Sequence, residues 1–384
     1  MPAHPVLTWT KGGTTSSVRW RSENGAPPPK RMVVADDIMT ADAAYQLASK
    51  GTALLWLGDF QNARQLLSAL ARRVDGKVRK PSKAPALPAS PASPVDTFHR
   101  HRMAQAQRAH TLGMLVIPFE AGHVIPLRRA PDVRQACTEA YGAGDEPYAA
   151  SLRELLGLIG AHEWRRKGVE IPALQARIHP HYGVFAPLRT EYVGLVAEAP
   201  LPPSCELAFD IGTGTGVLAA VLARRGVRRI VATDCDPRAL ACARENVARL
   251  KLGERVQVVD ADLFPEGQAP LVVCNPPWLP GRPSSALEHA IYDLEGRMLR
   301  GFIAGLAAHL APGGEGWLIL SDLAEHLGLR TRAELEAAFA AAGLTVVDRI
   351  DARPSHPKAA DASDPLHAAR AAEIVSLWRL AAAG

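Results

Sequence analysis

The residues best suited to chemistry form the tetrapeptide Asn275-Pro276-Pro277-Trp278, which comes directly after a short apolar run typical of a buried strand. The Asn275 side-chain oxygen and the Pro276 carbonyl can each accept a hydrogen bond from an N–H group, and Trp278 offers a flat surface for stacking. The two prolines stiffen the backbone that presents these groups. The tetrapeptide can therefore hold a planar nitrogen and draw its lone pair toward an electrophile.

A glycine-rich loop lies upstream of this tetrapeptide. Residues 210–216, Asp-Ile-Gly-Thr-Gly-Thr-Gly, come after one predicted strand and precede a predicted helix at 217–225. Glycines allow a sharp turn and a close approach of the backbone to a ligand, and the helix N-terminus offers free N–H groups. A dinucleotide-binding loop would need glycine where this chain has Val217. Taken alone, the loop can also be a structural turn.

Two further predicted strands end in carboxylates. Asp234 ends the second strand of the series, where a carboxylate can bind both hydroxyls of a ribose. Asp262 ends the third strand, where it can accept a hydrogen bond from an adenine amino group while Leu263 and Phe264 cover the ring. As an alternative, Asp234 and Asp236 are helix caps, and Asp236, which precedes a proline, is predicted to be one.

The G-x-G-x-G spacing, the acidic strand ends and N-P-P-W, in this order, resemble class I S-adenosylmethionine-dependent methyltransferases of the N-P-P-(Y/F/W) type. The resemblance covers about residues 176–350 and implies an α/β, Rossmann-like domain with a seven-stranded, mainly parallel sheet. It implies S-adenosyl-L-methionine as cofactor, bound by Asp210, Gly212, Thr213, Gly214 and Gly216 at the methionine part, Asp234 at the ribose, and Asp262 with Leu263 at the adenine. The catalytic residues it implies are Asn275, Pro276 and Trp278, and no metal is needed.

Two subfamilies share features with this chain. Residues 179–196, HPHYGVFAPLRTEYVGLV, are similar to the segment before the glycine loop in release-factor glutamine methyltransferases and ribosomal RNA guanine-amino methyltransferases. The glutamine enzymes usually carry P-R-x-E-T and N-P-P-Y, whereas this chain has Pro-Leu-Arg-Thr-Glu at 187–191 and N-P-P-W. Gly-Val-Phe at 183–185 is typical of the RNA enzymes, which usually carry Phe after N-P-P. The resemblance implies methyl transfer to a planar nitrogen and leaves both acceptors open.

The elements that must position these residues lie in the second half of the chain. Apolar runs predict strands at 207–211, 229–234, 256–262, 271–275, 317–322 and 344–350, with helices between them. A last strand at 373–380 comes after a polar loop and can return antiparallel. This pattern predicts a mainly parallel sheet with helices on both faces, within a methyltransferase domain at 176–384.

The first 175 residues have a different texture. Residues 1–35 are rich in Gly, Ser, Pro and basic residues without apolar periodicity, which predicts a flexible tail. Residues 36–175 are predicted to form a mostly helical, basic recognition domain, and the Pro- and Ala-rich stretch near 75–97 a linker within it. Apolar spacing predicts two short helices within 37–73, further helices at 97–112 and 147–167, and a strand at 114–118.

Charge is distributed unevenly along the chain. Residues 1–200 contain 25 Lys and Arg against 17 Asp and Glu, whereas residues 201–384 contain 19 against 22. A basic front half favours RNA, either tRNA or rRNA, as the methyl acceptor, although so small an excess can also serve solubility alone. A glutamine of a translation protein ranks second and a small molecule third. Outside enzymes, the alternative is a protein that only binds the cofactor.

Composition excludes several other classes of protein. No run approaches the roughly 18 apolar residues of a transmembrane helix, and the start lacks a secretory signal, so a cytoplasmic protein without a membrane is expected. The five cysteines are odd in number and lack C-x-x-C spacing. Reduced thiols are therefore expected rather than a disulfide framework or a zinc site. The histidines match no standard ligand spacing, and no bound metal is expected.

Overall fold

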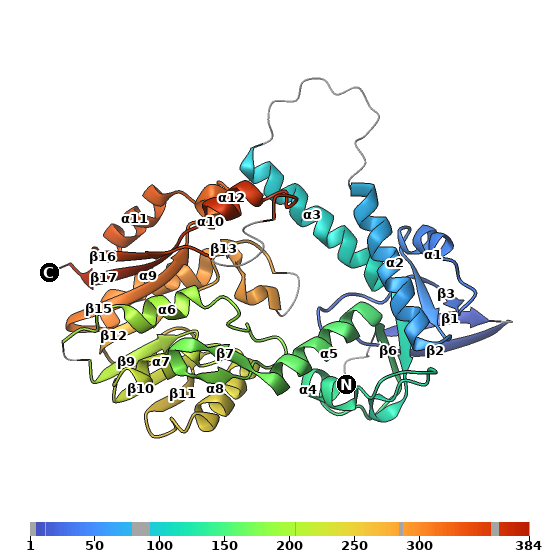
Figure 1. Ribbon diagram of the computed structural model, residues 1–384, viewed down its shortest axis with the longest axis horizontal. Coiled ribbons are helices and arrows are strands. Elements are labelled where there is room, and N and C mark those ends of the chain that lie inside the picture. The colour runs from blue at the N-terminus through green and yellow to red at the C-terminus, as the bar shows by residue number, and fades with distance from the viewer. Residues whose placement is uncertain are drawn as a thin grey trace. The chain divides into compact units, whose positions relative to one another are not determined.

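The computed structural model describes residues 5–11, 13–78, 93–203, 205–283, 287–354 and 361–383. The chain divides into two compact units (Figure 1). The N-terminal unit comprises Met1–Ala92 and His99–Glu163, and the C-terminal unit comprises Ser93–Phe98 and Trp164–Gly384. The chain thus divides near residue 164 rather than at the predicted 176. No helix among the described residues is long and apolar enough to cross a membrane.

The C-terminal unit is built on a seven-stranded sheet in the order β11-β10-β9-β12-β15-β17-β16. Its strands are β9 (Leu207–Ile211), β10 (Arg229–Asp234), β11 (Val256–Asp260), β12 (Ala269–Cys274), β15 (Leu310–Ser321), β16 (Leu344–Ala352) and β17 (Val375–Ala382). β17 runs opposite to the other six strands of this sheet, which are parallel to one another. The predicted α/β class and the mainly parallel seven-stranded sheet are therefore confirmed, including the antiparallel return of the last strand.

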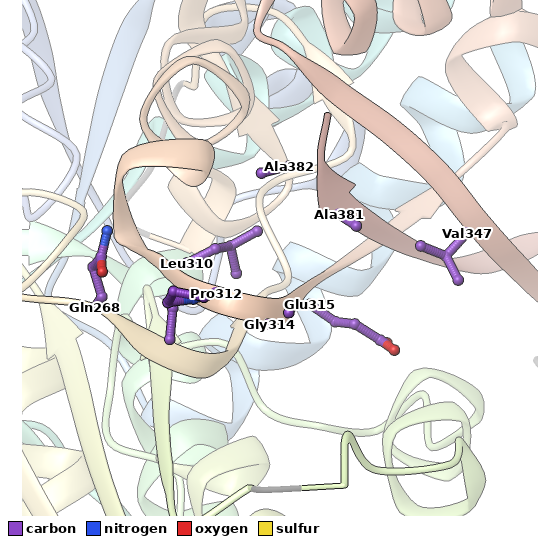
Figure 2. A pocket seen from close by; sticks show the side chains of 10 residues that line it. Gln268, Leu310, Pro312, Gly314, Glu315, Val347, Ala381 and Ala382 are labelled. Carbon is purple, nitrogen blue, oxygen red and sulfur yellow. The ribbon is translucent and has the colours of Figure 1, made fainter. Parts of the chain in front are cut away.

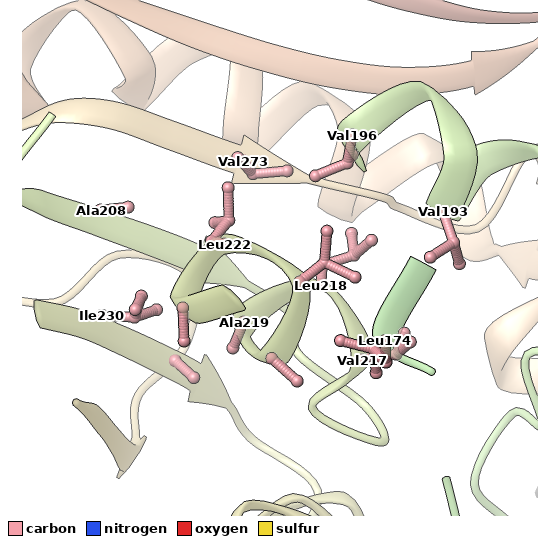
Figure 3. Close-up of a cluster of buried hydrophobic side chains, with 14 of the residues drawn as sticks. Leu174, Val193, Val196, Ala208, Val217, Leu218, Ala219, Leu222, Ile230 and Val273 are labelled. Carbon is pink, nitrogen blue, oxygen red and sulfur yellow. The ribbon is translucent and has the colours of Figure 1, made fainter. Parts of the chain in front are cut away.

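Helices cover both faces of this sheet, because successive strand residues point to opposite sides. Ile319 packs in one hydrophobic cluster, and its neighbours Leu318 and Leu320 pack in the other. The first cluster, drawn in Figure 3, includes residues of α6 (Glu191–Glu198), α7 (Val217–Arg224) and α8 (Pro237–Arg249). The second includes residues of α9 (Arg297–His309) and α11 (Arg332–Ala341). The strand ends are thus held by a core on each side.

Short elements connect these layers in the C-terminal unit. They are β7 (Val169–Ile171), β8 (Ala176–Ile178), β13 (Leu279–Pro280), β14 (Tyr292–Asp293), α10 (Leu323–His326) and α12 (His367–Ala372). As predicted, Asp236 is the N-cap of α8, since its side chain accepts a hydrogen bond from the Arg238 N–H group. β13 pairs with β14, which brings the segment after N-P-P-W back toward α9.

The N-terminal unit contains a six-stranded sheet in the order β1-β2-β6-β5-β4-β3. Its strands are β1 (Val6–Lys11), β2 (Thr14–Trp20), β3 (Arg31–Ala35), β4 (Thr52–Trp56), β5 (Leu115–Phe119) and β6 (Tyr148–Ser151). Its helices are α1 (Ala41–Ala48), α2 (Phe60–Val78), α3 (Pro94–Gly113) and α4 (Arg134–Tyr141), with α5 (Leu152–Lys167) running into the C-terminal unit. The predicted strand near 114–118 and the predicted helices within 37–73 and at 97–112 are present. Residues 147–167 contain the predicted helix only from Leu152, because Tyr148–Ser151 is strand β6.

One prediction about this unit is wrong, and another is incomplete. The predicted flexible tail at 1–35 contains three strands, because Leu7 and Trp20, 1% and 5% exposed, supply a buried face between small polar residues. Residues 36–175 do contain more helix than strand, but they also contribute to the six-stranded sheet. Thr52–Trp56, read as helix, is the fully buried strand β4. A short continuous apolar run fits either a strand or a buried helix by periodicity.

The predicted linker near 75–97 is shorter than expected at both ends. Helix α2 continues to Val78, and α3 begins at Pro94. Residues 79–92 of the predicted linker lie outside the described residues.

Candidate active site

The register of the sheet brings the predicted site residues to one edge. Ile211 of β9 pairs with Thr233 of β10 on one side and with Cys274 of β12 on the other. The next residues along these three parallel strands are Gly212, Asp234 and Asn275. Three features therefore lie side by side at the carboxyl ends of adjacent strands: the glycine loop, Asp234, which is predicted to bind a ribose, and the N-P-P-W tetrapeptide. Open α/β sheets bind ligands at this edge.

The glycine loop has the conformation that its sequence predicts. Gly212, Gly214 and Gly216 have φ angles of 68°, 53° and 80°, a region that side chains disfavour. A Cβ atom on Gly212 would clash with the Cε atom of Met298 in α9. A Cβ atom on Gly214 would meet no atom within 4 Å, so the backbone there faces open space. The loop thus provides a cradle that a ligand can approach closely.

Asp210 and Thr213 support this loop from beneath. The Asp210 carboxylate accepts hydrogen bonds from Thr213 Oγ1 at 2.6 Å and from the Ala219 N–H group at 3.0 Å. Burial, which leaves Asp210 1% exposed, raises its pKa to about 6. Thr213, 5% exposed, also donates its N–H to the Thr233 carbonyl. Both side chains face inward, so direct contact of these two with a cofactor stays a prediction.

Asp234 is placed to receive a diol. Its Oδ2 atom accepts the Gly214 N–H at 3.0 Å, and its Oδ1 atom accepts the Asp236 N–H at 3.0 Å. Burial raises the pKa of this carboxyl group. Each carboxylate oxygen has further acceptor capacity beyond one hydrogen bond. The carboxylate can therefore accept both hydroxyls of a ribose while the two backbone bonds fix its orientation.

The turn after β11 differs in part from the prediction. Asp262 forms an ion pair with Arg297 at the start of α9, and both side chains are exposed. Leu263 adopts a left-handed conformation, with φ 72°, and packs against α9 where a Cβ on Gly301 would lie 2.5 Å from it. The Phe264 ring stacks on His309 at 4.2 Å. Leu263 and Phe264, which were predicted to cover the adenine ring, thus pack on α9. The Asp262 carboxylate remains exposed.

The N-P-P-W tetrapeptide contains a hydrogen bond between its first and last side chains. Trp278 Nε1 donates to Asn275 Oδ1 at 2.9 Å. Pro276 is buried, whereas Asn275 and Trp278 are half-buried. The Trp278 ring packs against both hydrophobic clusters of the C-terminal unit. The predicted stacking of Trp278 on a flat target stays a prediction, while its contact with Asn275 is part of the structure.

Arg189 of the P-L-R-T-E segment joins this tetrapeptide. Its guanidinium carbon lies 4.8 Å from the centroid of the Trp278 ring, a cation–π distance. It also forms ion pairs with Glu191 at 2.6 Å and Glu373 at 3.1 Å. Glu373 accepts a further hydrogen bond from Ser321 Oγ at 2.7 Å. The sequence marked Arg189 only as a departure from a motif, and no local pattern pointed to Glu373, 184 residues away.

Neither a disulfide nor a group of metal ligands is found at this edge among the described residues. Cys274, directly before Asn275, is buried, and burial raises its thiol pKa well above the usual value. All five cysteines are free thiols. Among the described residues, no three His, Cys, Asp or Glu side chains group as metal ligands. The polar groups described at this edge of the sheet thus include the acceptor oxygens of Asp234 and Asn275 and backbone N–H groups.

A separate pocket of about 360 Å³ lies at the opposite edge of the sheet (Figure 2). It is lined by Gln268, Leu310–Glu315, Val347 and Ala381–Ala382, where β12 and β15 begin and β17 ends. Because the glycine loop and Asn275 come after the carboxyl ends of these parallel strands, this pocket is not part of the candidate site.

The region that contains this site is similar to known proteins. Residues 176–346 match the Methyltransferase small domain family. Release factor glutamine methyltransferase from Cereibacter sphaeroides is 33% identical over 180 residues, 43% of this chain and 63% of that protein. Ribosomal protein L11 methyltransferase from Pelotomaculum thermopropionicum is 38% identical over 143 residues, 37% and 39% of the two chains. This chain therefore spans less than two thirds of either relative.

Several solved structures match about half of this chain at low sequence identity. The ribosomal protein L11 methylase from Lactobacillus delbrueckii subsp. bulgaricus has 19% sequence identity and a TM-score of 0.34, and covers 53% of this chain and 85% of that chain.

Proposed function

We propose, from the premise that residues 176–346 form a Methyltransferase small domain, that this protein is an S-adenosyl-L-methionine-dependent N-methyltransferase. The observation that carries the proposal is the sheet register, which sets Asn275 beside Gly212 with Asp234 on the other side. A cofactor cradle and a hydrogen-bond acceptor for the target nitrogen are thus neighbours. The target is a planar nitrogen, because such a nitrogen needs acceptors for its N–H groups before its lone pair can react.

The residues at the strand ends fit the cofactor. The open space beside Gly214 leaves room for the methionine part, and its carboxylate is attracted to the N-terminus of α7, which follows in the chain. Asp234 keeps acceptor capacity on both oxygens for the ribose hydroxyls. Arg297 bonds to Oδ2 of Asp262, which leaves Oδ1 for an adenine amino group. When bound, the cofactor supplies an electrophilic methyl group on a sulfonium centre.

Asn275 and Pro276 hold the target nitrogen. Trp278 occupies one acceptor position of Asn275 Oδ1, and a second position remains for an N–H of the substrate. The Pro276 carbonyl accepts the other N–H. These two bonds orient the nitrogen and increase the electron density on it as the new bond forms, which is how fixed dipoles lower a barrier. A cofactor-binding protein without activity would have no use for this arrangement.

An exocyclic amino group of a base in RNA, either tRNA or rRNA, is the first candidate acceptor. The excess of basic residues in the first 200 positions supports it, because phosphate contacts favour such a distribution. The glutamine side chain of a translation protein is the second candidate. It is supported by the relative from Cereibacter sphaeroides, whose name assigns glutamine methylation of a release factor. Both acceptors present the planar nitrogen that Asn275 requires.

Transfer of tritiated methyl groups tests the function. Full-length protein and labelled S-adenosyl-L-methionine are added to an extract of a strain that lacks the protein, and the product is treated with ribonuclease or with protease. Label released by ribonuclease supports RNA, and label released by protease supports glutamine in a protein. Label in neither fraction, with the cofactor bound, would contradict methyl transfer to both classes of macromolecule.

A further inference from the structure

The orientation of the Asn275 amide is fixed by its partner. An indole nitrogen only donates hydrogen bonds, and of the two ends of an amide only the oxygen accepts them. The 2.9 Å bond from Trp278 Nε1 therefore determines that Oδ1, and not Nδ2, lies on the side of the indole. Rotation of the amide by 180° would set two donors against each other and leave a polar group without a partner.

The indole is itself held from several sides. Its ring packs against hydrophobic residues on both sides of the sheet, and the Arg189 guanidinium lies over it at 4.8 Å. Trp278 is half-buried. Because Arg189 covers one face of its ring, that face is not open to a flat substrate. These contacts suit a residue that supports Asn275 better than one that stacks on the target.

Arg189 is in turn fixed by two carboxylates. The side chains of Glu191 and Glu373 are 7% and 4% exposed, and each forms an ion pair with a different nitrogen of the guanidinium. Charge-assisted bonds in such a buried setting are strong and directional. Ser321, the last residue of β15, donates to the same Glu373 oxygen. A continuous series of contacts thus joins the ends of β12 and β15 to the segment just before β17.

We propose that Arg189 and Trp278 are positioning residues that keep the Asn275 oxygen aimed at the target nitrogen. This inference rests on the proposed methyltransferase function. Arg189 orients the indole, and the indole N–H selects one orientation of the amide before the substrate arrives. Misplacing a reacting group by about 1 Å can reduce a rate by about 100-fold, so loss of this control affects turnover more than binding.

The variant Trp278→Phe separates positioning from stacking, because phenylalanine keeps an aromatic face and lacks the N–H. Its matched control is Trp317→Phe, which removes an indole bond of similar length, 3.0 Å to Glu315 Oε2, within the sheet. In the methyl-transfer assay we expect Trp278→Phe to lower the maximal rate by about 10- to 100-fold. Two other quantities should stay within about threefold of wild type: the amount of acceptor-containing extract that gives half the maximal rate, and the affinity for S-adenosyl-L-methionine.

The role of Arg189 is read from the Trp278 indole signal in a ¹H–¹⁵N spectrum of the full-length protein, identified by its absence in Trp278→Phe. Arg189→Gln should move this signal and speed its exchange with water. The matched control is Arg379→Gln, which breaks an ion pair with Glu315 at 2.7 Å elsewhere in the unit and should leave the signal in place.

Each outcome bears on a different part of the proposal. If wild type transfers label and Trp278→Phe does so at the wild-type rate, the positioning role is wrong and the proposed function stands. An unmoved indole signal in Arg189→Gln would contradict the part assigned to Arg189. If wild type transfers no label to any fraction, the proposed function fails, and the positioning inference fails with it.

Discussion

The two units share an arrangement of four adjacent strands and differ in the partners of the residues just beyond those strands. In the C-terminal unit β9, β12 and β15 are parallel and β17 is antiparallel to β15. In the N-terminal unit β3, β4 and β5 are parallel and β6 is antiparallel to β5. In both units the four strands also occur in the same order along the chain.

The residues after the strands have different partners in the two units. In the N-terminal unit Asp59, which comes after β4, is buried and forms ion pairs with Arg128 and Arg129. Asp37, which comes after β3, accepts the Asp59 N–H and an Asn62 side-chain N–H. In the C-terminal unit Asp234 and Asn275 each accept intramolecular bonds and retain acceptor positions. Both sheets thus place acceptors just beyond their strands. The difference is that two arginines form ion pairs with Asp59, whereas the bonds to Asp234 come from backbone N–H groups.

Asn275→Ala should have the largest effect on the C-terminal unit. Loss of the acceptor oxygen should lower the rate of methyl transfer by about 100- to 1,000-fold, the usual consequence of removing one preorganised hydrogen-bonding group. The affinity for S-adenosyl-L-methionine, measured by calorimetry, should change by less than about threefold. The control is Asn62→Ala in the N-terminal unit, which removes a bond to Asp37 and should leave both quantities unchanged. Equal loss of affinity and rate in Asn275→Ala would contradict the assigned role.

Gly212→Ala tests the close approach at the loop. The added methyl group would meet Met298, and φ of 68° is unfavourable for alanine. We expect about 1–3 kcal/mol less stability and at least about tenfold weaker cofactor binding. Gly25→Ala in the N-terminal unit is the matched control, since it combines φ of 64° with open space. It should cost about 1–2 kcal/mol and leave cofactor affinity intact, and similar affinity losses in the two variants would argue against the cradle.

Asp234→Asn tests a carboxylate that is bonded to two backbone N–H groups, and Asp59→Asn tests one that forms ion pairs with two arginines. An amide offers one acceptor oxygen instead of two, so cofactor affinity should fall by about tenfold, the value of one charge-assisted bond. Asp59→Asn should instead lower the free energy of unfolding, because Arg128 and Arg129 lose their charged partner. Affinity is measured by calorimetry and unfolding by denaturant titration. A loss of affinity in Asp59→Asn that matched Asp234→Asn would remove the distinction between the units.

The pH dependence of stability should have opposite signs for two buried carboxyl groups. Burial raises the pKa of Asp210 to about 6, so its protonated form is favoured in the folded state. Its contribution to stability is present below the ordinary aspartate pKa and is lost as pH rises to about 6. The hydrogen bond from Arg129 lowers the pKa of Asp59, so its contribution is present above the ordinary value and is lost as pH falls below it.

Thermal unfolding between pH 3 and pH 8 measures these contributions. Asp210→Asn should flatten the decline of the melting temperature between about pH 4 and pH 6. Asp59→Asn should flatten the decline toward acid. If both variants flattened the melting-temperature curve in the same pH range, the environments assigned to Asp210 and Asp59 would be wrong.

Most of the C-terminal sheet, and the placement of the candidate site residues on it, could be predicted from the sequence. Buried strands such as Leu207–Ile211 are short apolar runs that lead into glycine, aspartate or asparagine, so both the strand and the candidate site residue at its end are local signals. Because parallel strands expose their carboxyl ends at one edge, Gly212, Asp234 and Asn275 could be placed together before the register was known.

Other features depend on contacts that no local pattern encodes. Strands β1 and β2 are rich in Thr and Ser, and their buried Leu7 and Trp20 become a face only when the sheet assembles. The partners Arg189 and Glu373 are far apart in sequence, as are Asp262 and Arg297. The packing of Phe264 on His309 likewise depends on how α9 lies against the sheet.

Calorimetric titration of the full-length protein with S-adenosyl-L-methionine tests the assignment of the cofactor to the C-terminal unit most directly. We predict saturable binding of one molecule per chain, weakened about tenfold by Asp234→Asn and unchanged by Asp59→Asn. Absence of binding to the wild-type protein, or the same affinity in wild type and Asp234→Asn, would contradict the placement of the cofactor at the strand ends of this unit.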